Sequence, residues 1–452
     1  MLTLVWQTKD IYKMLLIYTP KLFPRITYSI KTLLKTFLRF SDFEFTTSLE
    51  AYLQHEGPKF SYSNKTNESG IHFHSVGLLE QKGISELSIS VGNDQGIVTL
   101  FHHGNEHAVV PYDPFAASFY MLSRYEEYLP HIKDHYNRFS AKNSIAAKNN
   151  FLQTAVVDRW AAHVKSILKE AYPGLSFPEL SFNFLPTIDV DNAYAFKHKG
   201  VLRTLGALLR SIYQFDFQLL KMQLLVLLRK RKDPYDTYYY QLNLQKKYRL
   251  KTIYFFLLGD YGKHDKNISH ENKHFQSLIK NLADHSKVGI HPSFKTNYRP
   301  EQLATEINRL SRIVKRNIVS SRQHYIKLNL PETYRNLVKE DIEEDYTMGY
   351  ADAIGFRAGS CTPYFFYDLD EEMEVKLKIF PFQLMEASLK HYLNYSPETA
   401  IREIKKIIKE VVAVKGTLIS VWHNESLGEE LGWEGWREVY EALIETASNH
   451  QK

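Results

Sequence analysis

Ionisable residues end several short apolar runs in the second half of the chain, and their types are those that hydrolytic sites use. FNFLPTIDVD ends with Asp189 and Asp191, KVGIHPS contains His291, and IVSSRQHY contains His324. Two carboxylates two apart on a strand point to the same side. They repel each other unless a cation lies between them or one pKa rises. The pair favours a metal ligand, Asp191, beside a general base, Asp189. The alternative is that Asp191 caps the following segment.

The two histidines complete a candidate metal site. One carboxylate and two imidazoles, with positions left open for water, describe a catalytic zinc-type centre. A lone histidine is more often a core or surface residue. The prediction therefore depends on His291 and His324 both ending strands beside Asp191. The alternative for His324 is a hydrogen-bonded residue within the fold.

Other polar residues end the remaining runs. Arg357 in GFRAGS is flanked by small residues and would orient a carboxylate or stabilise an oxyanion; the alternative is a structural salt bridge. His423 in TLISVWHNES follows a hydrophobic strand and is a candidate general acid. Four further residues are candidates for the same edge: Asp260, Asp345, Trp422 and Glu425.

One motif points to a different chemistry. His270, Glu271 and His274 match H-E-x-x-H, which on a helix places two zinc ligands on one face beside a glutamate base. The surrounding sequence is polar, the match falls at the start of a predicted helix, and no third ligand follows at the usual spacing. A zinc metallopeptidase is therefore a remote alternative.

Positioning these residues requires strands that alternate with helices. The apolar runs after residue 182 are separated by helix-like segments such as 300–316, where Leu303, Ile307, Leu310 and Ile313 share one face. Such alternation implies a parallel sheet. Seven or eight units predict an α/β fold, a distorted (β/α)7-8 TIM-like barrel with its active site at the carboxyl ends of the strands.

The first half has a different pattern. Residues 1–40 carry helical spacing, and strand-like runs at 86–92 and 96–103 flank a turn-prone sequence. Asp113 is placed to cap a helix that begins at Pro114.

Residues 151–172 read as an amphipathic helix, and a cluster of Pro and Gly at 171–180 marks a boundary. We therefore predict two domains. A smaller α+β domain spans 1–180, and the barrel spans 181–452, with a basic helical insertion at about 200–235.

Composition limits the classes of function. The 452 residues are 44% hydrophobic and 24% charged, as in a globular protein. The single Cys361 excludes an internal disulfide and a cysteine-based zinc cluster. The net charge of +6 gives no support for a nucleic-acid partner, because segment 201–232 carries seven basic residues and one acid. That segment predicts either a helical cover or a surface for an anionic membrane. With no secretory signal, a cytoplasmic location is expected, with peripheral association at the inner membrane as an alternative.

The second half resembles the polysaccharide deacetylase superfamily (NodB-homology, carbohydrate esterase family 4). More closely, it resembles a divergent bacterial branch with an uncharacterised N-terminal domain. The resemblance is carried by TIDVD (187–191), GIHPSF (289–294), SRQHYIKL (321–328), EDYTMGYAD (344–352), GFRAGSCTPYFFYDLD (355–370) and ISVWHNES (419–426). It implies a metal-dependent hydrolase that removes N- or O-linked acetyl groups from a carbohydrate, in the synthesis or modification of a surface glycan.

The resemblance also implies residue roles. Asp189 corresponds to the catalytic base, Asp191 and His291 to metal ligands, Arg357 to the arginine of the R-x-P motif, and His423 to the general acid.

The chain departs from the family pattern at Lys295, where the second metal histidine belongs. Lysine is a poor ligand at neutral pH. We expect His324 to supply the missing ligand to a divalent metal, zinc by preference. The alternative is a non-catalytic barrel that binds glycan after losing its metal.

Overall fold

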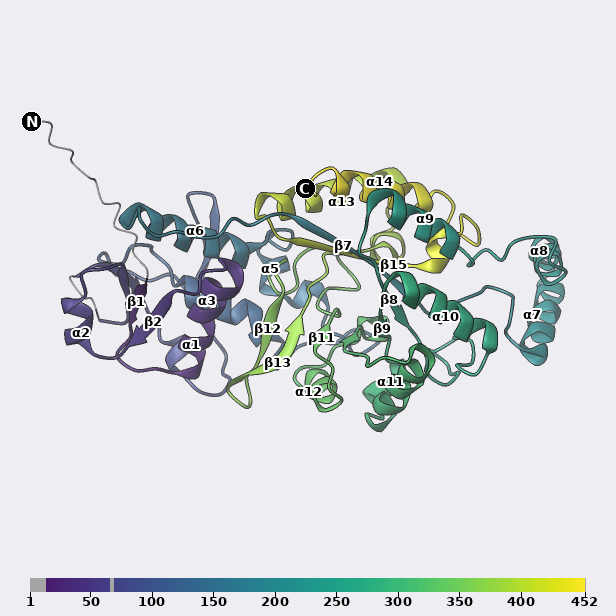
Figure 1. The fold of residues 1–452 in the computed structure, drawn as a ribbon, viewed down its shortest axis with the longest axis horizontal. Helices are drawn as coiled ribbons and strands as arrows, with labels where there is room; N and C mark the ends of the chain where they lie inside the picture. Colours follow the sequence, from purple (N-terminus) through teal and green to yellow (C-terminus); the bar gives the residue numbers. More distant parts are fainter. Residues whose placement is uncertain (1–13, 66–68, 452) are drawn as a thin grey trace, which may run out of the picture. The chain divides into compact units, whose positions relative to one another are not determined.

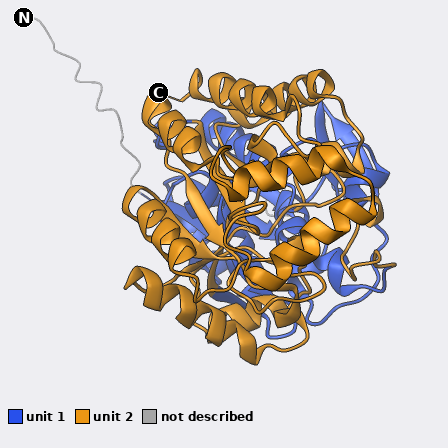
Figure 2. Cartoon of the chain, turned by 90° about the vertical axis from the view of Figure 1, so that its right-hand side faces the viewer, with its two compact units in different colours: residues 1–131, 144–181, 358–375 blue, residues 132–143, 182–357, 376–452 orange. Residues whose placement is uncertain are grey.

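The computed structural model describes residues 14–65 and 69–451. The chain forms two compact units, shown in two colours in Figure 2. Unit 1 comprises residues 1–131, 144–181 and 358–375, and unit 2 comprises residues 132–143, 182–357 and 376–452. The chain passes between the units near the predicted boundary at 180. It also passes between them at both ends of the inserted segments 132–143 and 358–375.

Unit 1 is built on a four-stranded parallel sheet with the order β2-β1-β3-β4. The strands are β1 (Leu15–Tyr18), β2 (Phe43–Thr46), β3 (Lys59–Ser63) and β4 (Ile71–His74). Every residue of β1 is buried, as expected for a short apolar run covered on both faces. The prediction of helix throughout 1–40 is therefore wrong at β1. It holds for α1 (Pro24–Lys31), and residues 1–13 lie outside the described part of the chain.

The other predictions for the first half are confirmed in part. Strands β5 (Val91–Asp94) and β6 (Ile97–Leu100) form an antiparallel hairpin, but residues 86–90 are not in a strand, and β5 includes Asn93 and Asp94, which were predicted to lie in the turn. Helix α6 (Val156–Ala171) lies within the predicted helix at 151–172. Helix α3 (Pro114–Leu122) begins at its cap Asp113, whose side chain accepts hydrogen bonds from the backbone of the first turn.

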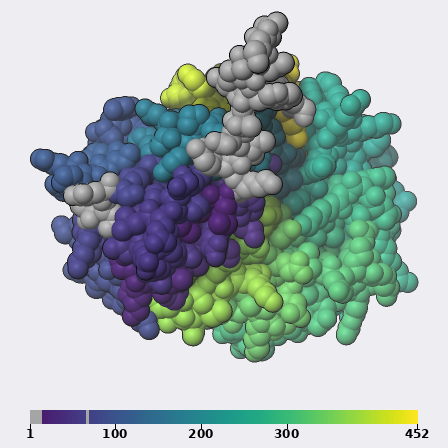
Figure 3. All heavy atoms as spheres, turned by 60° about the vertical axis from the view of Figure 1, so that its left-hand side comes forward, coloured from purple at the N-terminus to yellow at the C-terminus, as the bar shows by residue number. Residues whose placement is uncertain are grey.

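The inserted segment 358–375 belongs to unit 1 through specific contacts. Tyr28 donates to the carbonyl oxygen of Phe365 (2.7 Å), and Arg25 pairs with Glu372 (2.5 Å). The space-filling view shows this yellow-green segment against the purple residues of the first helices (Figure 3).

Unit 2 contains the sheet that positions the candidate site. Its strands run in the order β13-β11-β10-β9-β8-β7-β15-β14, and neighbouring strands in this order are parallel (Figure 1). Their bounds are β7 (Asn183–Val190), β8 (Ile253–Phe256), β9 (Lys287–Ile290), β10 (Ser320–Ser321), β11 (Glu344–Asp345), β13 (Met373–Ile379, of which 376–379 lie in unit 2), β14 (Leu384–Met385) and β15 (Thr417–His423). Strand β7 is central, between β8 and β15, so it receives support from both sides.

Helices follow most of these strands, as the alternating pattern predicts. In unit 2 they are α9 (Tyr238–Tyr248), α10 (Lys273–His285), α11 (Glu301–Val314), α12 (Glu332–Lys339), α13 (Pro397–Ala413) and α14 (Trp436–Ser448). The predicted helix at 300–316 is confirmed by α11.

The prediction of a closed barrel is wrong for the described residues, because no ladder joins β13 to β14. Residues 380–383 pass between them instead. Phe382 donates to the carbonyl oxygen of Met348, and Gln383 donates to that of Ile419. Pro381 lies in this segment and has no backbone N–H to donate to a ladder. The run 377–385 is accordingly split between two strands, and GFRAGS (355–360) forms turns where a strand was expected.

The basic insertion forms a helical hairpin, α7 (Val201–Tyr213) and α8 (Phe217–Leu227), at one edge of unit 2 (Figure 1). Across residues 14–65 and 69–451, no helix has both the length and the apolar character needed to cross a bilayer.

Gly289 allows the strands beneath the candidate site to approach each other closely. A Cβ at this position would lie 2.6 Å from Cε1 of Phe255 on β8 and 2.7 Å from the backbone oxygen of Ser320 on β10. We expect Gly289→Ala to lower the free energy of unfolding by about 1–3 kcal/mol, because the strands must separate.

Gly206→Ala is the matched control in urea denaturation. Gly206 lies within α7 with no atom near its added Cβ, so alanine should raise the free energy of unfolding by about 0.5–1 kcal/mol. Equal effects of the two substitutions would contradict the role assigned to Gly289.

Candidate functional site

Asp189 and Asp191 lie at the carboxyl end of the central strand β7. Asp189 is the penultimate residue of the strand and is buried, and Asp191 follows the last one with a half-buried side chain. The spacing of two carries both carboxylates to the same side, as the sequence predicts. Parallel strands end at one edge, so the loops after neighbouring strands bring their side chains to this pair.

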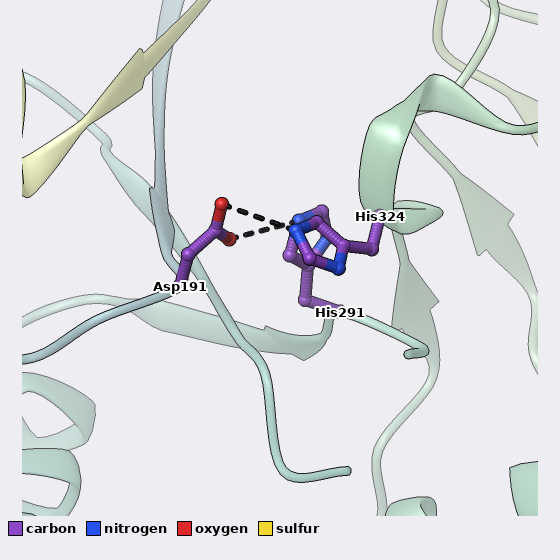
Figure 4. Close-up of side chains that lie close together, drawn as sticks. All are labelled: Asp191, His291 and His324. Carbon is purple, nitrogen blue, oxygen red and sulfur yellow. Dashed lines mark ion pairs between the residues drawn. The ribbon is translucent and has the colours of Figure 1, made fainter. Parts of the chain in front are cut away.

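Two imidazoles face Asp191. His291 follows β9, and its Nε2 lies 3.2 Å from Oδ1 of Asp191. His324 opens a short 3-10 turn after β10, and its Nε2 lies 3.3 Å from Oδ2. Figure 4 shows the three side chains converging from separate elements. Their ligand atoms all lie within 4.8 Å of one another, the one such group of three or more His, Cys, Asp or Glu among the described residues.

Each imidazole is oriented through its other nitrogen. Nδ1 of His291 donates to the carbonyl oxygen of Arg322 (2.5 Å), and Nδ1 of His324 donates to Oδ1 of Asp265 (2.8 Å). A proton on Nδ1 leaves the lone pair on Nε2 directed at the site, as in histidines that bind metals. Oδ1 of Asp191 is buried and accepts no hydrogen bond from the described residues. The donor set of two nitrogens and a carboxylate therefore fits a divalent cation such as zinc.

The charges of this group are strongly coupled. Burial alone would raise the pKa of Asp191, but His324 and His291 outweigh it and hold that pKa well below its usual range. Burial would likewise lower the pKa of His324, but Asp191 and Asp265 raise it to about 9. The carboxylates around His324 thus favour positive charge at this point, which a bound cation would supply in place of the His324 proton.

Arg322 holds Asp189. The fully buried guanidinium donates through Nη1 to Oδ1 of Asp189 (2.8 Å) and to Oγ1 of Thr187 (2.6 Å), and through Nε to the carbonyl oxygen of Tyr346. It also lies over the ring of Phe255. A buried carboxylate needs such a partner to stay ionised. The sequence interpretation missed Arg322, although it precedes His324 by two residues, the same spacing as the aspartate pair.

His423 ends β15 beside β7 and is paired with Glu386. Nδ1 of His423 donates to Oε1 of Glu386 (2.7 Å), and so does its backbone N–H (2.8 Å). Burial would lower the pKa of His423, but the fully buried Glu386 raises it well above its usual range. Nε2 of His423 lies 3.8 Å from Oδ2 of Asp191. Glu386 was also missed; it directly follows the short strand β14.

One pocket of about 470 Å³ joins these groups. It is lined by the predicted catalytic and metal residues Asp189, Asp191, His291, His324 and His423. Tyr136, Tyr325 and Tyr392 form an aromatic wall, and Arg138 supports it by donating to the carbonyl oxygen of Tyr325 (2.7 Å) and to the hydroxyl of Tyr392 (2.9 Å). Tyr136 of the wall and its support Arg138 come from the inserted segment 132–143, which was predicted to belong to the first domain.

The remaining predicted residues divide between the pocket and other places. Glu425 lines the pocket, and burial raises its pKa to about 7. Asp260 is exposed and pairs with Arg309. The other three are buried outside the lining of this pocket: Asp345, Arg357 and Trp422.

Each of those three has contacts of its own. Asp345 accepts hydrogen bonds from Ser321 and Thr347, Arg357 donates to the carbonyl oxygen of Gly349, and Trp422 packs on Tyr440. Arg357 was expected to orient a carboxylate, but the guanidinium that contacts the Asp189 carboxylate is that of Arg322.

The H-E-x-x-H motif does not form the helical pair that a metallopeptidase needs. Helix α10 begins at Lys273, so His270 lies in the turn before it and His274 in its first turn. His274 is exposed and stacks on His198. Lys295, at the family's second histidine position, is also exposed, and His324 lies opposite Asp191 in its place.

The first half of the chain matches a known family model. Residues 15–173 match the model of a family of unknown function, DUF7033. No curated protein matches the chain.

The solved structures similar to the chain are distant. A Mycobacterium smegmatis protein assigned as a polysaccharide deacetylase is 14% identical over 60% of this chain and 86% of its own, with a TM-score of 0.39. A polysaccharide deacetylase from Bacillus cereus is 13% identical over 60% and 88%, with a TM-score of 0.28. A 4-alpha-glucanotransferase from Thermococcus litoralis is 12% identical over 60% and 38%, with a TM-score of 0.36.

Removal of one candidate ligand tests the metal site. We expect His324→Ala to weaken zinc binding by about a hundredfold or more, since even partners of metal ligands contribute about 10–100-fold. Isothermal titration of the purified protein with zinc measures the effect.

His391→Ala is the control, because His391 lines the same pocket outside the three-residue group. Its zinc affinity should equal that of the wild type. Unchanged affinity and stoichiometry in His324→Ala would exclude His324 as a ligand.

Proposed function

We propose that the protein is a metal-dependent hydrolase that removes N- or O-linked acetyl groups from a carbohydrate, in the synthesis or modification of a surface glycan. The observation that carries the proposal is the convergence of Asp191, His291 and His324 with Asp189 and His423 on one pocket. The motifs shared with polysaccharide deacetylases support the same chemistry, and the distant structural likenesses add no weight.

The cation has a defined place in this proposal. Held by Asp191, His291 and His324, a divalent metal, zinc by preference, would polarise the acetyl carbonyl and favour an ionised water. His324 would replace the ligand that the family pattern places at Lys295.

Asp189 is the proposed general base. Its Oδ1 is engaged by Arg322, and its Oδ2 lies 3.9 Å from Nε2 of His291, on the side of the candidate ligands. The guanidinium fixes the rotamer of the carboxylate, so the second oxygen is free to accept a proton from the attacking water. Arg322 is thus a positioning residue.

His423 is the proposed general acid. Glu386 fixes its tautomer with a proton on Nδ1 and favours the imidazolium, which carries a second proton on Nε2 toward the pocket. When the bond between the acetyl carbon and the sugar nitrogen or oxygen breaks, that proton would pass to the leaving atom. An amine needs this proton more than a hydroxyl does, because an amide anion is a very poor leaving group.

The aromatic wall fits a sugar ring. Tyr136, Tyr325 and Tyr392 offer flat apolar faces and polar hydroxyls around one side of the pocket. These features match a pyranose, which has apolar C–H faces and hydroxyls at its rim.

Acetate release from acetylated chitooligosaccharides, with and without added zinc, tests the proposed function. We expect zinc-dependent turnover by the wild type. Asp189→Asn should lose at least about a hundredfold in kcat, because it cannot accept the proton, and should keep zinc affinity within a few-fold. If the wild type binds the sugar but releases no acetate with any divalent metal, the non-catalytic glycan-binding alternative is correct.

The role of His423 is tested by leaving groups of different basicity. We expect His423→Ala to lower kcat on the N-acetyl sugar by about 10²–10⁴-fold. Its rate on p-nitrophenyl acetate should change little, since p-nitrophenolate leaves without a proton. Equal losses on both substrates would indicate a structural role for His423.

A further inference from the structure

The hairpin of α7 and α8 has an unusual distribution of side chains. Ten of the 24 large hydrophobic side chains that are exposed in the described chain lie within residues 201–228. Leu202, Tyr213 and Phe215 are 86%, 85% and 79% exposed. Patches of this kind mark interaction surfaces.

The interface between the two helices is small and partly polar. Ser211 is the one buried residue of α7, and its hydroxyl donates to Oε1 of the buried Gln223 of α8 (3.2 Å). Val226 is buried beside them. Leu208 is half-buried and lines the same cavity as Gln223. The other leucines of α7 are exposed: Leu202, Leu205 and Leu209. Water alone would favour the reverse arrangement.

The base of the hairpin is closed firmly. The buried carboxylate of Asp233, just after α8, accepts hydrogen bonds from the backbone N–H groups of Ala195, Phe196 and Lys197, which precede α7. Arg203 reaches from α7 to the carbonyl oxygens of Lys266 and Asn267. The exposed apolar face therefore belongs to a braced element.

The turn between the helices carries aromatic residues. Tyr213, Phe215 and Phe217 are all exposed there, and the rings of the two phenylalanines lie 6.5 Å apart. Aromatic side chains of this kind favour the boundary between lipid headgroups and acyl chains.

The basic residues of the hairpin indicate the kind of surface that it binds. Exposed basic residues accompany the apolar face: Arg210, Lys221, Arg229, Lys230 and Lys232. Arg231 also lies in this run and pairs with Glu430 (2.8 Å). The sole acid of 201–232, Asp216, caps α8 by accepting from the backbone of Leu219. An apolar face flanked by basic residues fits an anionic lipid surface.

We infer that the α7–α8 hairpin docks the protein on an anionic membrane surface, with Tyr213, Phe215, Phe217 and the leucines of α7 entering the headgroup boundary. This inference does not rest on the proposed hydrolase activity. Flotation of the full chain with vesicles of phosphatidylglycerol and phosphatidylcholine tests it, with phosphatidylcholine vesicles as the neutral comparison.

We expect the wild type to bind the anionic vesicles and to be released by salt. The double substitution Phe215→Ser and Phe217→Ser should weaken binding by about tenfold or more, because it removes the inserting rings. Lys230→Glu with Lys232→Glu should also weaken it by about tenfold or more, because each basic residue contributes to attraction.

Matched controls separate this hairpin from general surface effects. Tyr239 is an exposed aromatic residue on α9, and Lys405 and Lys409 are exposed on α13. Tyr239→Ser and the double substitution Lys405→Glu with Lys409→Glu should bind the vesicles as the wild type does. The residues substituted in all four variants are exposed, so thermal unfolding should match the wild type.

The inference would be overturned if the wild type did not bind anionic vesicles, or if the hairpin variants and their controls lost binding equally. It would also be overturned if the wild type formed a dimer without binding vesicles, and if Phe215→Ser with Phe217→Ser converted that dimer to monomers. That last outcome, measured by light scattering, would assign the apolar face to a second copy of the chain.

Discussion

Two carboxylates end one strand, and each must be neutralised by a different cation. Asp189 is met by Arg322 from the loop after β10, and Asp191 is met by the imidazoles of His291 and His324. The spacing of two forces both acids to the same side of β7. The loops after β9 and β10 must therefore bring opposite charge to one point, which is possible because these parallel strands end at the same edge of the sheet.

The hydrogen-bond partners of the three imidazoles fix how each ring is oriented. Asp265, Glu386 and the carbonyl oxygen of Arg322 each accept from an Nδ1. Every imidazole of the site thus presents Nε2 to the pocket. The histidines differ in their distance from Asp191. Nε2 of His291 and of His324 lies within 3.3 Å of its carboxylate, whereas Nε2 of His423 lies 3.8 Å away and His423 is paired with Glu386.

The sequence was sufficient to predict the positions of polar residues that follow apolar runs. It was insufficient to predict the residues that hydrogen-bond to them. Asp189, Asp191, His291 and His423 could be predicted because apolar runs show where strands stop. Asp265 and Glu386 could not, because a buried acid that supports a histidine 59 or 37 residues away leaves no local pattern. The closed barrel was wrong for a related reason. Counting strands does not reveal that residues 380–383, with Pro381 among them, replace a ladder. GFRAGS resembled a strand by composition, but it forms turns, and the contact expected of its arginine is made by Arg322.

One side of the pocket is formed by a segment that lies far from the candidate ligands in the sequence. Tyr136 of its aromatic wall and the supporting Arg138 come from the short segment 132–143, which belongs to unit 2 but lies between two stretches of unit 1 in the sequence. A fragment that starts at residue 182 would retain every candidate ligand and both proposed proton-transfer groups, yet it would lack this side of the cavity. The two units are interlaced along the polypeptide. Neither can be transplanted by a single cut, and changes in the loop at 132–143 would alter what the cavity accepts while leaving the candidate metal ligands and proton-transfer groups untouched.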